Sequence, residues 1–109
     1  MVDTKAIQDF RDQIIELYKP QKIILFGSYA YGAPSVDSDV DILVILPFEG
    51  KNAYKSAEIL TKTNPRFPVD LITRTPEEVK DRLAKGDFFL KEILNKGRIL
   101  YEATDARMD

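Results

Sequence analysis

Two short apolar runs, Ile23–Phe26 and Val40–Leu46, enclose a polar stretch that begins with Gly27 and Ser28. The first run is short, continuous and apolar, as expected for a strand buried on both faces. Ser28 is a suitable N-cap for a helical turn over residues 29–31, so the strand is predicted to lead through glycine into a helix start. The first N–H groups of a helix lack internal partners and favour an anion. The pattern therefore predicts a phosphate-sized backbone corner after the first strand.

The second run carries two acidic residues at its beginning, Asp39 and Asp41. Side chains two residues apart share one face of a strand, so both carboxylates should lie on the face of Leu43 and Ile45. Their Cα atoms would be roughly 6.6 Å apart, from two strand rises of about 3.3 Å. Two carboxylates at the mouth of an apolar strand repel each other unless a cation lies between them. We therefore predict a divalent-metal site here.

Three other interpretations of this stretch were considered. The glycine spacing imitates a phosphate-binding P-loop, but Ala33 and Pro34 occupy the positions that require Lys and Ser or Thr. Alternate aspartates imitate an EF-hand, but Ile42 replaces its glycine and Phe48 its bidentate glutamate. A plain polar turn remains as the structural alternative, and the flanking strands argue against it.

The remaining pattern alternates helices and strands, which predicts an α/β (α+β) fold with a small mixed sheet of about four strands packed with helices. The expected elements are a helix from Asp3 or Thr4 with apolar residues Ile7, Phe10, Ile14 and Leu17, a helix over 52–63 with Ala53, Ala57 and Leu60, a strand over 67–73, a helix from Thr75 to Gly86, a helix from Asp87 to Gly97, and a strand over 98–102. We expect one domain over 1–102 and a disordered tail over 103–109.

Composition narrows the chemistry. The 109 residues contain no cysteine and no histidine, which excludes disulfides and thiolate chemistry and disfavours a zinc site. Oxygen ligands remain, and these favour Mg²⁺, with Mn²⁺ as an alternative. The net charge is −2, and basic and acidic residues are interspersed along the chain. No basic face for direct nucleic-acid binding is therefore evident. No signal peptide or membrane-length apolar run is evident, so a cytoplasmic protein is expected.

The motif G-S-x10-D-x-D, formed by Gly27, Ser28, Asp39 and Asp41 between two apolar strands, resembles that of the nucleotidyltransferase superfamily with a polymerase-beta-like palm. The short chain and its GSYAYG sequence are most similar to the minimal nucleotidyltransferase (MNT) proteins, antitoxins that accompany a helical HEPN toxin. The resemblance covers essentially the whole chain. It implies a palm fold and transfer of a nucleotidyl group.

The resemblance also implies roles for individual residues. Gly27 and Ser28 would bind the nucleotide triphosphate, and Asp39 and Asp41 would hold Mg²⁺, with two ions expected. A third carboxylate is expected on a later strand, where Asp70 is the candidate for both catalysis and metal binding. An aspartate inside a strand is unfavourable unless it faces a site or water. The alternative, an edge strand with Asp70 in solvent, is supported by nearby Pro68.

Two features depart from the pattern or stay open. Many family members carry Arg at the position of Tyr31, so another cation such as Lys51 or Lys55 could hold the phosphates, while Tyr29 and Tyr31 could simply pack the helical turn. The aromatic residues near the end of the chain either close the core, which is the favoured interpretation, or stay exposed as an interface; these are Phe88, Phe89 and Tyr101.

The implied function is that of an antitoxin that transfers AMP from ATP to a tyrosine of a HEPN toxin, forming a hetero-oligomer or a homo-oligomer. No segment of this chain is left over to bind an acceptor, so a separate protein must present it. A non-catalytic module that neutralises its partner by binding is the second hypothesis. A stand-alone enzyme for small molecules is the third.

Overall fold

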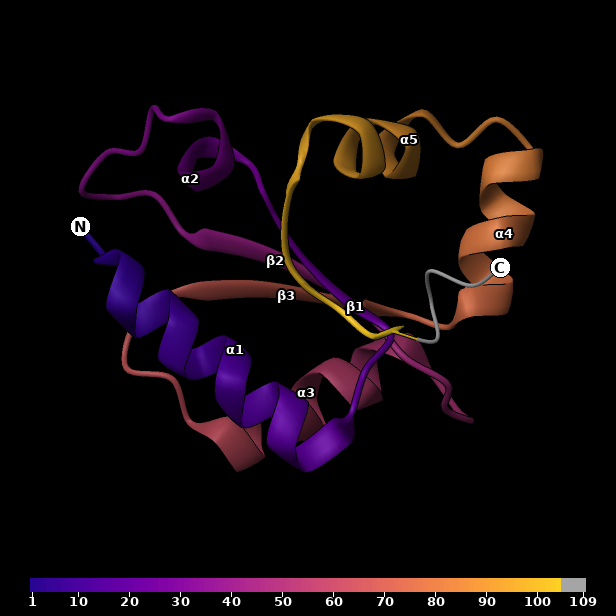
Figure 1. The fold of residues 1–109 in the computed structure, drawn as a ribbon, viewed down its shortest axis with the longest axis horizontal. Helices are drawn as coiled ribbons and strands as arrows, with labels where there is room; N and C mark the ends of the chain where they lie inside the picture. The colour runs from indigo at the N-terminus through magenta and orange to yellow at the C-terminus, as the bar shows by residue number, and fades with distance from the viewer. Residues whose placement is uncertain (105–109) are drawn as a thin grey trace.

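The computed structural model describes residues 1–104, and these form one mixed four-stranded sheet with helices on both faces (Figure 1). In chain order the elements are α1 (Thr4–Tyr18), β1 (Lys22–Phe26), α2 (Ser28–Tyr31), β2 (Val40–Ile45), α3 (Asn52–Thr63), β3 (Val69–Arg74), α4 (Pro76–Ala84), α5 (Phe88–Lys96) and β4 (Arg98–Glu102). The strand order is β3-β2-β1-β4. β1 is antiparallel to β2 and β4, and β2 is parallel to β3. The predicted fold class is confirmed.

The alternation of side chains along the strands gives each face of the sheet its own core. On one face, residues such as Val40, Ile42 and Val44 pack with α1 and α3. On the other face, Leu43 and Ile45 pack with Val79, Leu90 and Ile93 from α4 and α5. Figure 1 shows α1 and α3 below the sheet and α2 and α5 above it. The predicted division of β2 between two faces is therefore correct.

Local signals fix the helix starts. The Asp3 carboxylate accepts a hydrogen bond from the Ala6 N–H at 2.8 Å. Thr75 and Glu78 form a complete capping box, with Pro76 at the first helical position. The Asp87 carboxylate accepts from the Leu90 N–H at 3.0 Å and thereby starts α5. These caps agree with the helix starts expected from the sequence.

Some expected details differ. Leu17 is 54% exposed, because α1 buries only Ile7, Phe10 and Ile14. In α3 the buried residues are Ile59 and Thr63, while Ala53 and Ala57 face solvent. Leu60 packs against the core as expected. The expectation is wrong for the two alanines, because small side chains carry little information about which side of a helix is buried.

The end of the chain and the strand of Asp70 also differ slightly. β3 begins at Val69, two residues after the expected start, because Pro68 cannot donate a ladder hydrogen bond. The Ala103 N–H donates to the Gln21 carbonyl at 2.9 Å, so ordered backbone continues past residue 102. The rest of the expected tail, residues 105–109, lies outside the described residues. No helix within residues 1–104 is long and apolar enough to span a membrane.

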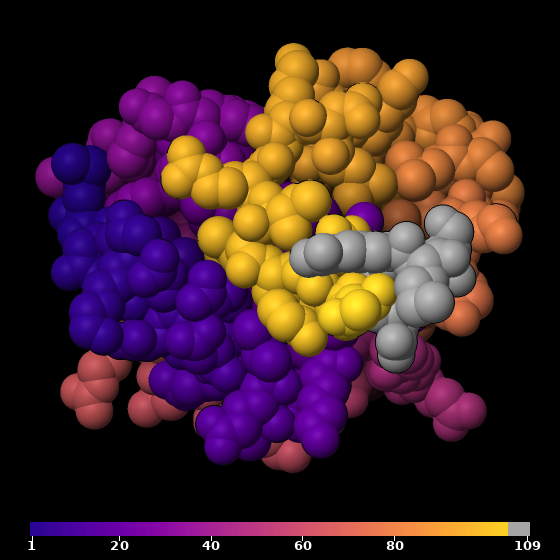
Figure 2. Space-filling view, viewed as in Figure 1, coloured from indigo at the N-terminus to yellow at the C-terminus, as the bar shows by residue number. Residues whose placement is uncertain are grey.

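Figure 2 shows how the helices cover the sheet from the outside. β4 runs across the front of the molecule, with α5 above it and α1 to its left. α5 stands between α4 and the segment that contains α2. The two helices α2 and α5 thus border the part of the sheet where β1 ends and β2 begins.

Candidate active site

The corner after β1 is formed by Gly27, which has φ 72° and ψ −158°. This backbone conformation is open to glycine and strained for other residues. The Gly27 carbonyl accepts hydrogen bonds from the N–H groups of Ala30 at 3.0 Å and Tyr31 at 3.1 Å, which closes the short helix α2. The structure corrects the expected cap. Gly27 is the N-cap, and Ser28 is the first helical residue and makes no side-chain cap bond.

Gly27 also lies directly against Asp41. Phe26 pairs with Asp41 across the β1–β2 ladder, which brings the following glycine beside the Asp41 carboxylate. A Cβ atom added to Gly27 would collide with Asp41 Oδ2. The glycine is therefore required for two reasons, its backbone angle and its closeness to an acidic side chain.

The parallel pairing of β2 with β3 sets Asp41 beside Asp70 in register. Burial raises the pKa of Asp41, and the negative charges of Asp70 and Asp39 raise this pKa further. Asp39 is exposed and immediately precedes β2. The structure therefore gathers the negative charge of three aspartates around the start of β2. The edge-strand position expected in the structural alternative for Asp70 is also real, because β3 is the last strand of the sheet.

This arrangement suits a divalent cation. Carboxylate oxygens are the ligands that Mg²⁺ prefers, and a cation would relieve the repulsion that raises the pKa of Asp41. Within residues 1–104, no three acidic side chains already converge on one point as finished metal ligands. Asp39, Asp41 and Asp70 thus fit a divalent cation by the chemistry of their oxygen atoms and by their charge. Their roles as metal ligands stay a prediction.

A pocket of about 680 Å³ opens above these acids. Gly27, Asp41 and Asp70 line it, whereas Ser28 and Asp39 do not. The other lining residues, which sequence reasoning did not assign to the site, are Phe26, Tyr31, Phe88, Phe89, Glu92 and Ile93. The volume lies in the range typical of small-molecule sites, about 300–1,000 Å³. A nucleotide-sized ligand can be housed beside the glycine corner.

The aromatic residues of α5 were predicted to close the core or to stay exposed, and the structure divides them. Leu90 and Ile93 close the core, while Phe88 is 72% exposed and Phe89 is 52% exposed. Phe89 contacts Phe26 edge-to-face at a centroid distance of 5.8 Å. The favoured interpretation was therefore wrong for these two residues. Tyr101 packs partly buried against the core on the α1 side.

The two tyrosines of α2 also behave differently. Tyr29 packs against the core, and its hydroxyl accepts a hydrogen bond from the Val2 N–H at 3.0 Å. Tyr31 is 52% exposed and lines the site pocket. Packing therefore explains Tyr29 but not Tyr31.

The lysines considered as substitute phosphate ligands lie elsewhere. Lys55 pairs with Glu58 at 3.3 Å and lies over the rings of Tyr18 and Phe48 on the α1–α3 side of the sheet. Lys51 precedes α3, beyond the far end of β2, and lies over Tyr54. Neither lysine lines the pocket of Asp41 and Asp70. This expectation was wrong, because α3 covers the face of the sheet opposite to the site.

Comparisons with known proteins agree with this geometry. The model of the nucleotidyltransferase domain family matches residues 7–100. A protein of Methanocaldococcus jannaschii, named as a candidate protein adenylyltransferase, is 30% identical over 103 residues, covering 93% of this chain and 100% of the relative.

Solved structures show the same fold. A candidate nucleotidyltransferase from Sulfolobus solfataricus has a TM-score of 0.63 at 20% identity, with 90% of this chain and 78% of that chain covered. A complex of an MNT antitoxin with a tri-AMPylated HEPN toxin from Shewanella oneidensis contains a chain with a TM-score of 0.50 at 20% identity, with coverage of 93% and 76%. By the match to the family model and to its relative, this chain belongs to the nucleotidyltransferase domain family and is a nucleotidyltransferase.

Proposed function

We propose that this chain transfers AMP from ATP to a tyrosine hydroxyl of a HEPN-type toxin and thereby acts as its antitoxin in the cytoplasm. The observation that carries the proposal is the in-register pair Asp41 and Asp70 beside Gly27 in one pocket. The relative named for protein adenylylation and the similarity of fold to a chain in an AMPylated toxin complex support the choice of acceptor.

The residues of the site divide into those that bind the triphosphate and those that hold the metal ion. The glycine corner and the first N–H groups of α2, with the Ser28 hydroxyl, bind the triphosphate. Asp39, Asp41 and Asp70 would hold Mg²⁺, which when bound neutralises the negative charge of the phosphates and the leaving pyrophosphate. Asp70 lies at the pocket wall, where it can accept the proton of the acceptor hydroxyl.

The transfer itself exchanges one bond for another. The acceptor oxygen forms a bond to the α-phosphorus of ATP, and the bond between the α-phosphorus and the bridging oxygen breaks. Pyrophosphate leaves with that oxygen, and the acceptor proton passes to a carboxylate. The protein contributes chiefly the placement of these groups and the charge around them.

Mass spectrometry of the intact partner tests the proposal. The chain is co-expressed with the HEPN-type protein of its own genome, and the purified complex is incubated with ATP and Mg²⁺. We expect the partner mass to rise in steps of one adenylyl unit, and to stay unchanged without ATP or with EDTA. A partner that binds but never gains mass would contradict the proposed transfer.

A second function, neutralisation by binding alone, is favoured by one observation. Within the described residues, no Lys or Arg lines the site pocket, and Tyr31, for whose position the family resemblance implies Arg, lines it. A variant with Asp39→Asn, Asp41→Asn and Asp70→Asn separates the two functions. Rescue of cells from the toxin by this variant would support binding alone, and loss of rescue with complex formation intact would support catalysis.

A further inference from the structure

The beginning of α5 presents an exposed aromatic surface next to the candidate active site. Phe88 and Phe89 are 72% and 52% exposed, and Tyr31 across the pocket is 52% exposed. All three line the pocket of Asp41 and Asp70. Exposed large apolar side chains that gather at one place mark binding surfaces more often than isolated ones do.

This surface stands on a rigid support. The Asp87 carboxylate caps α5 and pairs with Arg82 at 3.0 Å. Leu90 and Ile93 anchor the other side of the helix in the core, with 3% and 1% exposure. Phe88 is thus held in place by a capped and anchored helix, although its own side chain contributes little to the core. Rigid aromatic side chains bind a partner with little loss of conformational freedom.

Phe88 also separates two hollows. It lines the site pocket and, on its other side, an outer hollow of about 400 Å³ bordered by Leu83, Lys91 and Leu94. The site pocket alone has the size of a small-molecule site. A nucleotide with its triphosphate at Gly27 therefore leaves the outer hollow and the ridge of Phe88 for a second, longer ligand.

The negative charge of the residues that line the site pocket indicates the kind of ligand that binds beside the nucleotide. Asp41, Asp70 and Glu92 line the pocket, and no Lys or Arg among the described residues does. Asp41 and Asp70 are assigned to the metal, whereas Glu92, which pairs with Lys96 at 3.3 Å, has no task in the transfer. Its carboxylate is placed to attract a basic side chain on whatever enters beside the nucleotide.

We propose that Phe88, Phe89 and Glu92 form the acceptor-docking surface of this enzyme, which binds a segment of the acceptor protein with an apolar side chain in the outer hollow and a basic residue near the hydroxyl that is modified. This proposal rests on the proposed function, because it requires a protein acceptor. It assigns acceptor specificity to α5 and leaves nucleotide binding to the corner of β1 and α2.

Kinetics with Phe88→Ala test the aromatic part. Transfer to the co-expressed HEPN-type partner is measured against acceptor concentration, and binding of a non-hydrolysable ATP analogue with Mg²⁺ is measured separately by calorimetry. We expect the acceptor KM to rise at least about tenfold, with kcat and the nucleotide Kd within about twofold of wild type. Tyr54→Ala, which removes an aromatic side chain of equal exposure (71%) from α3, is the matched control and should change neither value.

The charged part is tested with Glu92→Gln. We expect the acceptor KM to rise about three- to tenfold at low salt and less at high salt, because exposed charge pairs are screened by ions. Asp9→Asn is the control, since Asp9 also belongs to an i,i+4 pair, with Lys5 on α1, and lies away from the site pocket.

Several outcomes would overturn the proposal. An unchanged acceptor KM for Phe88→Ala would remove the docking surface, and a raised nucleotide Kd would make it a site for the base. A wild-type dimer that becomes monomeric in Phe88→Ala, by analytical ultracentrifugation, would make a second copy of this chain the occupant. If the wild-type protein itself never modifies the partner, the proposed function fails first, which is a distinct result.

Discussion

Two acidic side chains on opposite faces of the sheet, Glu58 and Asp41, have opposite surroundings. On the α1–α3 face, Glu58 accepts a hydrogen bond from the Tyr18 hydroxyl at 2.9 Å and pairs with Lys55. These contacts lower the pKa of Glu58, the hydrogen bond from Tyr18 most of all. On the other face, burial raises the pKa of Asp41, and the like charges of Asp70 and Asp39 raise it further. Glu58 has its partners within the protein, whereas Asp41 and the two aspartates beside it are left for a ligand.

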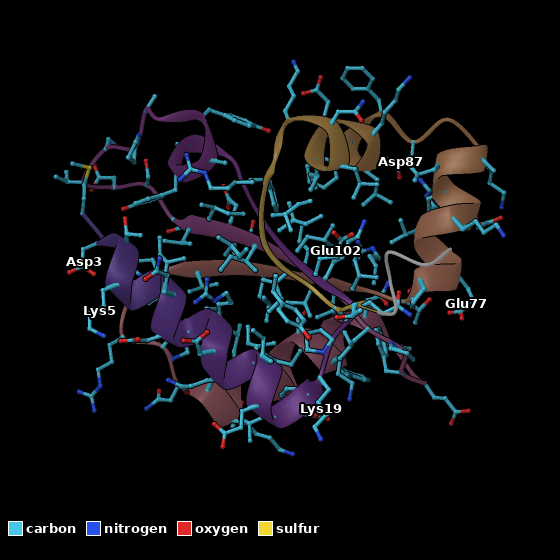
Figure 3. All side chains as sticks on the ribbon, viewed as in Figure 1. Asp3, Lys5, Lys19, Glu77, Asp87 and Glu102 are labelled. Atoms are coloured by element: carbon cyan, nitrogen blue, oxygen red, sulfur yellow. The ribbon has the colours of Figure 1, made fainter. Side chains whose placement is uncertain are left out.

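Helix length explains the difference. The helices α1 and α3 have 15 and 12 residues and cover one face. The helices α4 and α5 have nine residues each, and at the start of β2 the site pocket lies between α5 and the short α2. On the α1–α3 face, β2 is covered by packed helices along its length. On the opposite face, the start of β2 opens into the site pocket. Stability and chemistry are thus divided between the two faces of β2. In Figure 3 the labelled capping residues Asp3 and Asp87 mark the start of α1, below the sheet, and of α5, above it.

Asp39→Ala should give the largest effect and act on chemistry alone. Removing one metal-binding carboxylate should lower transfer at least about a thousandfold. Asp39 is exposed, so the melting temperature should not fall. Intact-mass assays of the partner and thermal unfolding measure both values. Near-normal transfer would refute the metal role of Asp39.

Ile42→Ala should show the opposite profile. Ile42 is fully buried on the α1–α3 face, and its truncation should cost about 2–5 kcal/mol of unfolding free energy. Below the melting temperature, the transfer rate per folded molecule should stay near wild type. Denaturant unfolding and active-site titration separate the two quantities. A strong loss of rate in the folded protein would show that the two faces are coupled.

Gly27→Ala should affect both stability and activity, since this residue joins them. The alanine would need a positive φ and would collide with Asp41, so we expect a loss of about 1–3 kcal/mol together with a large drop in transfer. Gly86→Ala is the matched control, because Gly86 also has a positive φ (82°) but no atom within 4 Å of the added Cβ. Equal losses in both variants would mean that contact with Asp41 is unimportant.

Asp41→Asn should change the stability only modestly, with a defined dependence on pH. The raised pKa means that the folded state binds the proton of Asp41 more tightly than the unfolded state does. The contribution of Asp41 to the unfolding free energy therefore falls as the pH rises through its raised pKa. The variant should melt a few degrees higher than wild type at pH 7 without Mg²⁺, and the difference should vanish below pH 3.8, the ordinary pKa of Asp.

Added Mg²⁺ sharpens this last test. The ion should raise the melting temperature of the wild type more than that of Asp41→Asn, because binding to the folded state stabilises it. A wild type that is already more stable than the variant without Mg²⁺ would contradict the repulsion among Asp39, Asp41 and Asp70.

The sequence predicts the sheet and its acids well because these depend on local rules. Strand periodicity places Asp41 on the face of Leu43, and the capping pattern at Thr75 and Glu78 sets the start of α4. Weak local signals fail. The two alanines Ala53 and Ala57 suggest the wrong face of α3, since a small side chain fits either environment.

The walls of the site lie outside the reach of such rules. Tyr31 and Glu92 line one pocket although they are 61 positions apart, and only the packing of α2 and α5 over the sheet brings them together. The exposure of Phe88 could have been suspected from its place directly after the cap Asp87, opposite Leu90 and Ile93. Lys51 and Lys55 lie away from the phosphate site because the crossover connection from β2 to β3 places α3 on the opposite face of the sheet. Predicting this requires the handedness of that connection.

That crossover has a consequence for how such a protein can change over time. The connection from β2 to β3 runs through α3 on the α1–α3 face of the sheet. The alignment of Asp41 with Asp70 depends only on the parallel pairing of β2 with β3. Residues can be gained or lost in the connections at 47–51 and 64–67 without shifting one carboxylate past the other. The number of residues between Asp41 and Asp70 can therefore change in evolution, even though the two residues stay directly paired on neighbouring strands.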